Sequence, residues 1–119
     1  MDELREVTVT PDRYVTYRYA GASGDFNPIH LDDEFARSVE LPGKILHGLW
    51  TMAQVARVHG EAAGDPLALK SLSVQFRGLG VPEKDITITS KPRGDGEFDT
   101  EAVQDGNKLV RRGRAVLKL

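Results

Sequence analysis

The segment that most constrains the fold is residues 47–63, which predicts a long helix that is apolar on most of its sides. At 1.5 Å per residue this helix is about 25 Å long. A helix of this kind has to be covered by other elements of the protein. Its expected apolar positions are Leu46, Leu49, Trp50, Met52, Ala53, Val55, Ala56 and Val58, and its narrow polar stripe is Thr51, Gln54, Arg57 and Glu61.

The chain after this helix predicts β-strands joined by tight turns. Apolar and polar residues alternate in four segments, at residues 71–77, 86–89, 97–102 and 108–119. Residues 94–96 predict a turn, and Asp105-Gly106 predicts a hairpin. Successive hairpins make an antiparallel sheet, and curling that sheet around the helix is the economical way to cover it. The sequence therefore predicts an α+β fold, with an antiparallel sheet wrapped around one long central helix.

The chain before the long helix predicts one strand and two short helices. The strand is expected over residues 5–10, which alternate and are β-branched. The helices are expected over residues 11–20 and 33–39. Their expected borders are Thr10 as N-cap and Gly21 and Gly24 as the end of the first, and Asp32 as N-cap of the second.

Composition narrows the class of protein. The 119 residues fit one domain, residues 1–119, and 39% hydrophobic with 29% charged residues suits a globular protein. A net charge of −2 gives no support for nucleic-acid binding. The sequence has no cysteine, which rules out disulfides and thiolate chemistry. No apolar run approaches the ~20 residues of a membrane span, and the charged start lacks an apolar signal core, so a cytoplasmic protein is expected.

Residues 19–31 carry the strongest functional signal. They hold an acid, Asp25, and an imidazole, His30, five residues apart in the chain. Pro28 fixes its own φ and keeps Asn27 out of helical geometry. Imidazole titrates near neutral pH and can therefore take up and return a proton. We expect a shaped loop that presents Asp25 and His30 together for acid–base chemistry.

Two motifs resemble one protein family. Residues 19–30 read Tyr-Ala-Gly-Ala-Ser-Gly-Asp-Phe-Asn-Pro-Ile-His, which is similar to the hydratase signature of MaoC-like proteins. Residues 46–52, Leu-His-Gly-Leu-Trp-Thr-Met, resemble the start of that family's central helix. MaoC-like proteins have the hot-dog fold, in which a sheet wraps a helix. The sequence most resembles the beta subunit of the mycobacterial-type (3R)-hydroxyacyl-ACP dehydratase and the (R)-specific enoyl-CoA hydratases.

The resemblance implies a catalytic site made of Asp25, His30 and Gly48. Asp25 and His30 fall on the family's acid–base pair, and the Gly48 N–H falls on the donor that holds the thioester carbonyl. The implied activity is that of a hydro-lyase, an (R)-specific 3-hydroxyacyl-thioester dehydratase or trans-2-enoyl-thioester hydratase. It would act on an acyl-CoA or an acyl carrier protein without a metal or other cofactor. Ala53 stands where some relatives have a serine, which affects the expected substrate range.

The resemblance also implies assembly. Family members join two protomers edge to edge, so a homodimer or a heterodimer with a second hot-dog subunit is expected. Two other functions remain open, a hot-dog acyl thioesterase and an acyl-binding partner subunit of a heterodimeric dehydratase. The intact Asp25 and His30 motif argues against both.

Several further residues have a plain and a functional interpretation. Asn27, Pro28, His47 and Trp50 are expected beside the substrate, although His47 more simply caps or packs at the helix start and Trp50 more simply lies in the core. His59 is expected to be favoured by the helix dipole or to lie at an interface. The basic face of the last strand is usually only solvated, but it would also suit an acidic carrier protein or CoA phosphates. Its members are Lys108, Arg112, Arg114 and Lys118.

Overall fold

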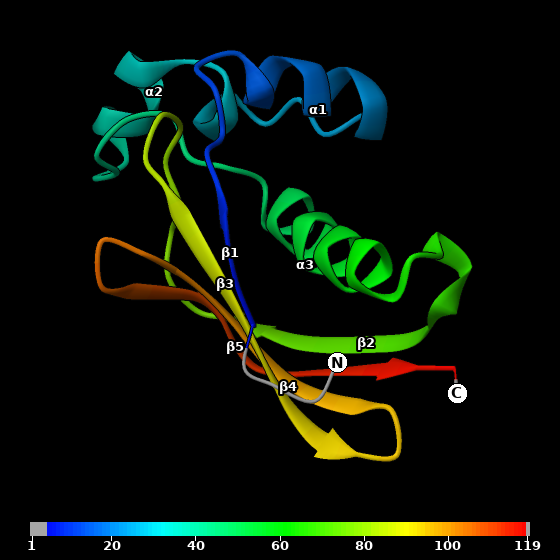
Figure 1. The fold of residues 1–119 in the computed structure, drawn as a ribbon. Helices are drawn as coiled ribbons and strands as arrows, with labels where there is room; N and C mark the ends of the chain where they lie inside the picture. Colours follow the sequence, from blue (N-terminus) through cyan, green and yellow to red (C-terminus); the bar gives the residue numbers. More distant parts are fainter. Residues whose placement is uncertain (1–4, 119) are drawn as a thin grey trace.

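The computed structural model describes residues 5–118 and has the predicted order of elements (Figure 1). The strands are β1 (Arg5–Val9), β2 (Leu69–Phe76), β3 (Ile86–Gly94), β4 (Glu97–Gln104) and β5 (Asn107–Leu117). The helices are α1 (Val15–Ser23), α2 (Asp33–Ser38) and α3 (Gly48–Ala63), with 3₁₀ turns at Pro28–His30 and Pro66–Ala68. Among residues 5–118 no helix is both long and apolar enough to cross a bilayer.

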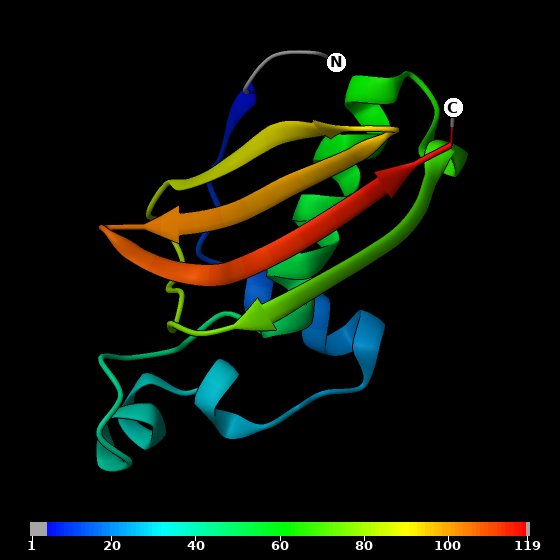
Figure 2. The same ribbon diagram turned by 90° about the horizontal axis from the view of Figure 1, so that it is seen from below.

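The strands form one antiparallel sheet in the order β1-β3-β4-β5-β2. β3, β4 and β5 follow one another through the two predicted turns, where Asp95 and Asp105 adopt positive φ of 56° and 49°. β1 and β2 are the two edges of the sheet. Figure 2 shows the curved sheet passing across α3. The predicted fold, an antiparallel sheet around one long helix, is confirmed.

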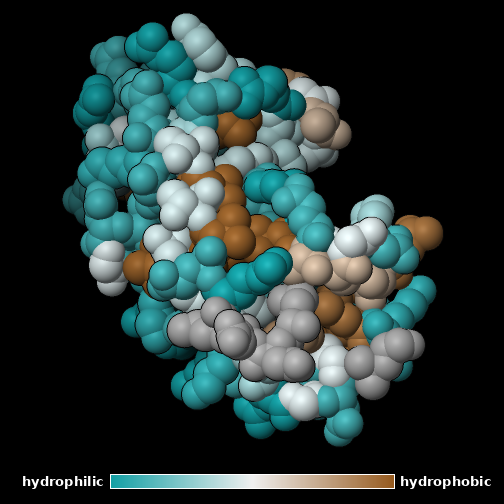
Figure 3. All heavy atoms as spheres, viewed as in Figure 1, coloured by the Kyte–Doolittle hydropathy of each residue, from teal (hydrophilic) through white to brown (hydrophobic). Residues whose placement is uncertain are grey.

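The core lies between α3 and the concave face of the sheet. Val55 and Val58 of α3 are buried against Ile86 of β3 and Val110 of β5. The opposite side of α3 is less covered than predicted, because Leu49 is 60% exposed in the single chain. Figure 3 shows apolar side chains gathered between the helices and the sheet, and hydrophilic ones over the α1–α2 end. The sheet of one chain therefore covers one side of the helix and leaves another open.

The predicted polar stripe of α3 is only partly correct. Arg57 donates from Nε to Gln54 Oε1 at 3.1 Å and from Nη1 to Glu61 Oε1 at 2.8 Å, so these three side chains form a surface network. Thr51 is instead buried and lines the same cavity as His30. The helical spacing of the polar residues does not distinguish the buried Thr51 from the other three members of the stripe, which are not buried.

α1 begins and ends later than predicted. Thr10 does not cap it, because its hydroxyl bonds to the Asp85 carboxylate at 2.5 Å instead. The helix starts at Val15 and continues through Gly21 without interruption. Gly24 ends it in the left-handed conformation, with φ of 79° and its N–H bonded to a carbonyl of the last turn. Gly24 is therefore the stop, and Gly21 is not.

α2 begins where the sequence predicts. Asp32 caps it by accepting the backbone N–H groups of Glu34 at 2.9 Å and Phe35 at 3.2 Å. Asp33 accepts the Lys44 N–H at 2.8 Å and its ammonium at 3.0 Å. These two bonds hold the pKa of the Asp33 carboxyl below its usual range. They also fix the segment that leads into α3.

His59 fastens the second half of α3 to β3, which corrects the expectation of a dipole-favoured or interfacial residue. The residue is 0% exposed. Its Nδ1–H donates to the Val55 carbonyl at 2.8 Å, and its Nε2 accepts the Ser90 hydroxyl at 2.8 Å. Burial lowers the pKa of the His59 imidazole. This histidine has a structural role.

Two of the four basic side chains expected on the basic face of the last strand, β5, pair with acidic side chains of β4. The Lys108 ammonium is 2.7 Å from Glu101, and the Arg114 guanidinium is 3.3 Å from Glu97. These ion pairs offset part of the charge that would attract an acidic carrier protein. The plain interpretation of this face therefore has the stronger support.

Candidate active site

The loop after α1 is held by short-range hydrogen bonds from its own side chains. Ser23 Oγ accepts the Asp25 N–H, and Asp25 Oδ1 accepts the Asn27 N–H, both at 3.2 Å. Asn27 Oδ1 accepts the Ile29 N–H at 3.1 Å and so caps the 3₁₀ turn, in which Pro28 takes the first position. The loop therefore has a defined shape, as predicted. Asp25 Oδ1 helps to hold this shape, and Asp25 Oδ2 faces His30 instead.

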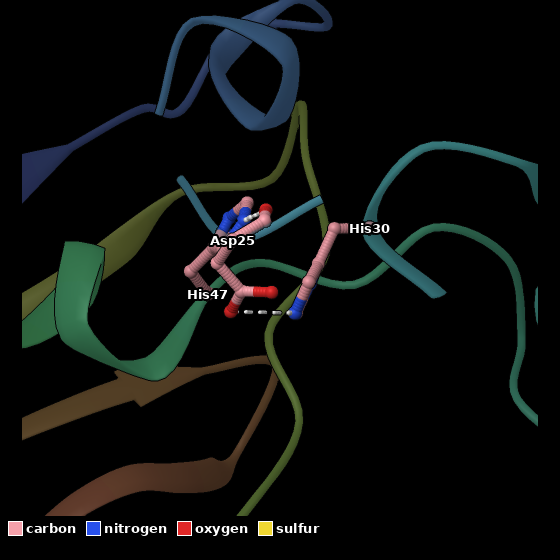
Figure 4. Close-up of side chains that lie close together, drawn as sticks. All are labelled: Asp25, His30 and His47. Carbon is pink, nitrogen blue, oxygen red and sulfur yellow. Dashed lines mark hydrogen bonds and ion pairs between the residues drawn. The ribbon is translucent and has the colours of Figure 1, made fainter. Parts of the chain in front are cut away.

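His30 lies at the end of the 3₁₀ turn with its ring oriented by the backbone. It is 7% exposed, and its Nδ1 is 2.8 Å from the Ile45 carbonyl oxygen. A carbonyl only accepts, so Nδ1 carries the hydrogen, and in the neutral ring Nε2 holds a lone pair. Nε2 lies 3.8 Å from Asp25 Oδ2 (Figure 4). The structure thus brings the predicted pair together with two acceptor atoms facing one another.

The distance between these two acceptors is informative. At 3.8 Å the atoms are too far apart for a direct hydrogen bond. A water molecule between them can donate one hydrogen to Nε2 and the other to Oδ2. Asp25 has a side chain that is 52% exposed, whereas the His30 side chain is enclosed. The pair therefore joins a buried imidazole, that of His30, to a half-exposed carboxylate, that of Asp25.

Gly48 and His30 line the same cavity, which has a volume of about 210 Å³. Gly48 is the first residue of α3, and its N–H donates to no acceptor among residues 5–118. This N–H lies at the positive end of the helix dipole, where developing negative charge is stabilised. A Cβ added at Gly48 would lie 3.2 Å from the Phe76 ring. Glycine therefore leaves room for a group to approach the backbone.

His47 precedes Gly48 and packs behind the pair. Its ring stacks on His30, with centroids 3.8 Å apart and planes 19° from parallel. Its Nε2 is 3.0 Å from the backbone oxygen of Asp25. It occupies the N-cap position of α3 but makes no capping hydrogen bond. The packing expected of His47 is confirmed, and the capping is wrong.

The residues predicted to lie beside the substrate have different places. Asn27 is exposed and caps the 3₁₀ turn, and Pro28 is exposed at the start of that turn. Trp50 packs against the hydrophobic core. His47 and Trp50 are not among the residues that line the cavity beside His30. Substrate contact by these four residues stays a prediction.

The site holds three side chains of metal-binding type. One ligand atom from each of Asp25, His30 and His47 lies within 4.8 Å of the others. A metal ion binds an imidazole nitrogen in the plane of the ring, and the two stacked rings lie in nearly parallel planes. Nε2 of His47 is also bonded to a carbonyl. The arrangement suits proton transfer better than one ion bound by all three residues.

Sequence reasoning missed three residues that shape the site. Ser23 lies two positions before Asp25, a spacing typical of hydroxyl-to-backbone turns, and this spacing was a usable signal. Ile45 acts only through its carbonyl, which leaves no trace in residue type. Phe76 was predicted as an ordinary strand residue, and its contact with Gly48 depends on the fold.

Comparison with known proteins places this geometry in a family. Residues 1–112 match the family model described as a MaoC like domain. The chain is 34% identical over 110 residues to peroxisomal enoyl-CoA hydratase 2 of Arabidopsis thaliana, covering 91% of this chain and 35% of that protein. It spans well under half of the length of the curated relatives that it matches.

Solved structures have the same fold. A MaoC-like dehydratase from Phytophthora capsici superposes with a TM-score of 0.89 and 29% identity, over 96% of this chain and 40% of that one. An (R)-hydratase from A. caviae superposes with a TM-score of 0.85 and 21% identity, over 99% of this chain and 95% of that one. The family model, the shared fold and the paired Asp25 and His30 agree, and the chain belongs to the MaoC-like domain family.

Proposed function

We propose that this chain is an (R)-specific trans-2-enoyl-thioester hydratase that also catalyses the reverse reaction, dehydration of a 3-hydroxyacyl thioester. The observation that carries the proposal is the pair of facing acceptors, His30 Nε2 and Asp25 Oδ2, 3.8 Å apart. His30 also lines a cavity together with Gly48, whose N–H has no acceptor in the part of the chain that the structure describes. The R configuration is inferred from the relatives, one of which is named an (R)-hydratase.

The reaction can be written with the residues of this chain. Water held between the two acceptors loses a proton to His30 Nε2, and its oxygen bonds to the β-carbon of the enoyl thioester. The double-bond electrons move toward the thioester carbonyl, whose developing negative charge is stabilised by the Gly48 N–H. His30 then returns the proton to the α-carbon. Asp25 Oδ2 accepts a hydrogen bond from the second O–H of the water, whose hydrogen stays on the oxygen as the new 3-hydroxyl, and the Asp25 carboxylate stabilises the positively charged ring.

The test is the loss of enoyl-thioester absorbance with purified protein and trans-2-enoyl-CoA substrates of short and long chain. We expect a 3-hydroxyacyl product of R configuration, and a rate about 10²- to 10⁴-fold lower for His30→Ala and Asp25→Asn. Glu61→Gln, on the surface network of α3, is the control and should retain the rate. No absorbance change at any chain length, or wild-type rates in both variants, would reject the proposal.

The same samples test the two alternatives. A thioesterase would release free thiol, which a thiol reagent detects in the same cuvette. An acyl-binding partner subunit would neither consume the enoyl group nor release thiol, but would bind the acyl thioester. Replacing the CoA ester with an acyl carrier protein ester then distinguishes the two carriers.

We also propose that the chain works as a dimer of hot-dog subunits. β2 is an edge strand of the sheet, and apolar residues in or near it are exposed, namely Leu49, Leu67 and Phe76. A groove of about 640 Å³ along α3 is lined by Ala53, Ala56 and Gly60 among others. A chain of the ChsH1-ChsH2 complex from Mycobacterium tuberculosis has the same fold, so one structural neighbour was solved as a complex of two proteins. Light scattering on the purified chain distinguishes a homodimer from a monomer that needs a second subunit.

A cytoplasmic location stays a prediction. The Arabidopsis relative is named a peroxisomal enzyme, so fractionation of the source cells is the experiment that decides.

A further inference from the structure

We propose that His47 is a positioning residue that holds the loop carrying Asp25 in place beside His30 in the proposed active site. The kinetic test of this proposal rests on the proposed function, whereas the contacts that support it do not depend on that function. His47 holds the backbone of Asp25 through a 3.0 Å bond from Nε2, and it stacks on His30 at 3.8 Å. It is joined by the peptide bond to Gly48. Figure 4 shows its ring beside the Asp25 backbone, with the His30 ring next to it.

The position of His47 fits an indirect role. It is 3% exposed, and it is absent from the residues that line the cavity of about 210 Å³ beside His30. It also gives α3 no capping bond, although it occupies the N-cap position. Its hydrogen-bonding capacity is directed to the loop that carries Asp25. Tyr19 of α1 closes the other side of the ring, at a centroid distance of 4.9 Å.

The tautomer follows from the partners. The Asp25 carbonyl only accepts, so Nε2 of His47 carries the hydrogen. Nδ1 is buried and has no hydrogen-bond partner among residues 5–118, which suits a lone pair better than an N–H. His30 has the opposite tautomer, with its hydrogen on Nδ1 facing the Ile45 carbonyl. The two stacked rings therefore differ, and only His30 presents a lone pair toward Asp25 Oδ2.

Two substitutions separate the two contacts of His47. His47→Phe keeps a flat ring for stacking but removes the donor to the Asp25 carbonyl. His47→Gln keeps an amide N–H near the place of Nε2 but removes the ring. If the bond to Asp25 positions the loop, we expect His47→Phe to lower kcat with trans-2-butenoyl-CoA by about 10- to 100-fold. KM should change by less than about threefold, and His47→Gln should recover most of kcat.

His59 supplies the matched control, because it is a second buried histidine of the same helix. His59→Gln should lower the unfolding temperature and leave kcat of the folded enzyme unchanged. A rise in KM with unchanged kcat in His47→Phe would overturn the proposal, because it would make His47 a substrate-binding residue. Equal loss of kcat in His47→Phe and His47→Gln would also overturn it, because it would indicate a packing role.

A measurement without substrate keeps the proposal testable if the wild type has no hydratase activity or if His47→Phe does not fold. ¹⁵N NMR of histidine-labelled wild type should show one ring with hydrogen on Nε2 that correlates with the Asp25 loop. In His47→Gln the amide resonances of residues 25–27 should stay near their wild-type positions. Hydrogen on Nδ1 of His47, or displaced loop resonances in His47→Gln, would overturn the proposal. Absence of hydratase activity alone would reject the proposed function.

Discussion

Two buried histidines, one just before α3 and one in its second half, make different kinds of contact. His47, at the start, bonds to the Asp25 backbone in a loop and stacks on His30. His59, 12 residues later, bonds to Val55 of its own helix and to Ser90 of the sheet. Both are shielded from solvent. Burial alone therefore does not separate a functional histidine from a structural one, whereas the identity of the bonded segments does.

The two ends also differ in what surrounds the helix. At its start, α3 has a Gly48 N–H with no acceptor among the described residues 5–118, a cavity and an exposed Leu49. Toward its end the helix is fixed on the sheet by Val58 and His59. We infer that the start of α3 contributes to chemistry and the second half contributes to stability. The predictions below test this division.

The largest contrast is expected from the same substitution at His30, which shares a cavity with the start of α3, and at His59 in the second half of α3. His30→Gln removes the lone pair that faces Asp25 Oδ2, so the hydration rate should fall by about 10²- to 10⁴-fold with little change in unfolding temperature. His59→Gln should do the reverse, because loss of the fully buried ring leaves a cavity and a glutamine does not reproduce both bonds of the ring, to Val55 and to Ser90. Enoyl-thioester kinetics and thermal unfolding measure both. Comparable losses of activity in His30→Gln and His59→Gln would contradict the division between a chemical start and a structural second half of α3.

The next contrast is in stability, between alanine substitutions at Gly113 in the sheet and at Gly48 at the start of α3. A Cβ at Gly113 of β5 would lie 2.5 Å from the backbone oxygen of Thr100, so Gly113→Ala has to displace the sheet. We expect a loss of about 3 kcal/mol in the free energy of unfolding. The nearest atoms to a Cβ at Gly48 belong to the Phe76 side chain, at 3.2 Å, and that ring can move. Gly48→Ala should change stability by less than about 1 kcal/mol.

The same two variants should differ in catalysis. The new methyl of Gly48→Ala narrows the cavity beside His30, and kcat/KM should fall by about 10-fold. Gly113→Ala should retain the wild-type kcat/KM per folded molecule. Urea denaturation and enoyl-thioester kinetics on each variant make the comparison. Loss of stability in Gly48→Ala equal to that in Gly113→Ala would contradict it.

A smaller effect is expected from acid. Burial lowers the pKa of His59 in the folded protein, so the unfolded chain takes up that proton first as the pH falls. The stability contributed by neutral His59 is therefore fully present above about pH 6.5 and is lost progressively below it. His59→Gln should show a flatter dependence of unfolding free energy on pH between 7 and 5. Ser90→Ala keeps the buried ring and should keep the steeper slope, and identical slopes in all three proteins would reject this origin.

Sequence patterns predicted the regular parts of the fold well. Alternation located the strands, and Asp105-Gly106 located a hairpin, because these signals depend on neighbours in the chain. Thr10 misled for the opposite reason. Its capping signal is local, but its hydroxyl bonds to Asp85, 75 residues away. Local propensity therefore failed where a distant partner competed for the same side chain.

The site was predictable in its reacting groups and unpredictable in its supports. The structure brings Asp25 beside His30 and puts Gly48 on the cavity that His30 lines, in agreement with the motifs that carry them, and their catalytic roles stay a proposal. Ile45 supports His30 through a carbonyl that every residue type shares, so no pattern marks it. The role of His47 depends on the stacking of two rings from different segments, which appears only in three dimensions.

The smallest contrast compares two aspartates that flank the two ends of α3. Asp33 clamps Lys44, next to the Ile45 carbonyl that orients His30, and Asp65 caps the 3₁₀ turn after the helix by accepting the Leu67 N–H at 2.9 Å. Asp33→Asn and Asp65→Asn should each cost about 0.5–1 kcal/mol of stability. Only Asp33→Asn should also lower kcat, by about two- to fivefold, because looser support of Ile45 misaligns His30. Enoyl-thioester kinetics beside urea midpoints measures both effects. If both variants lose kcat equally, the start of α3 has no special control over the ring, and the division between a chemical and a structural end of the helix fails.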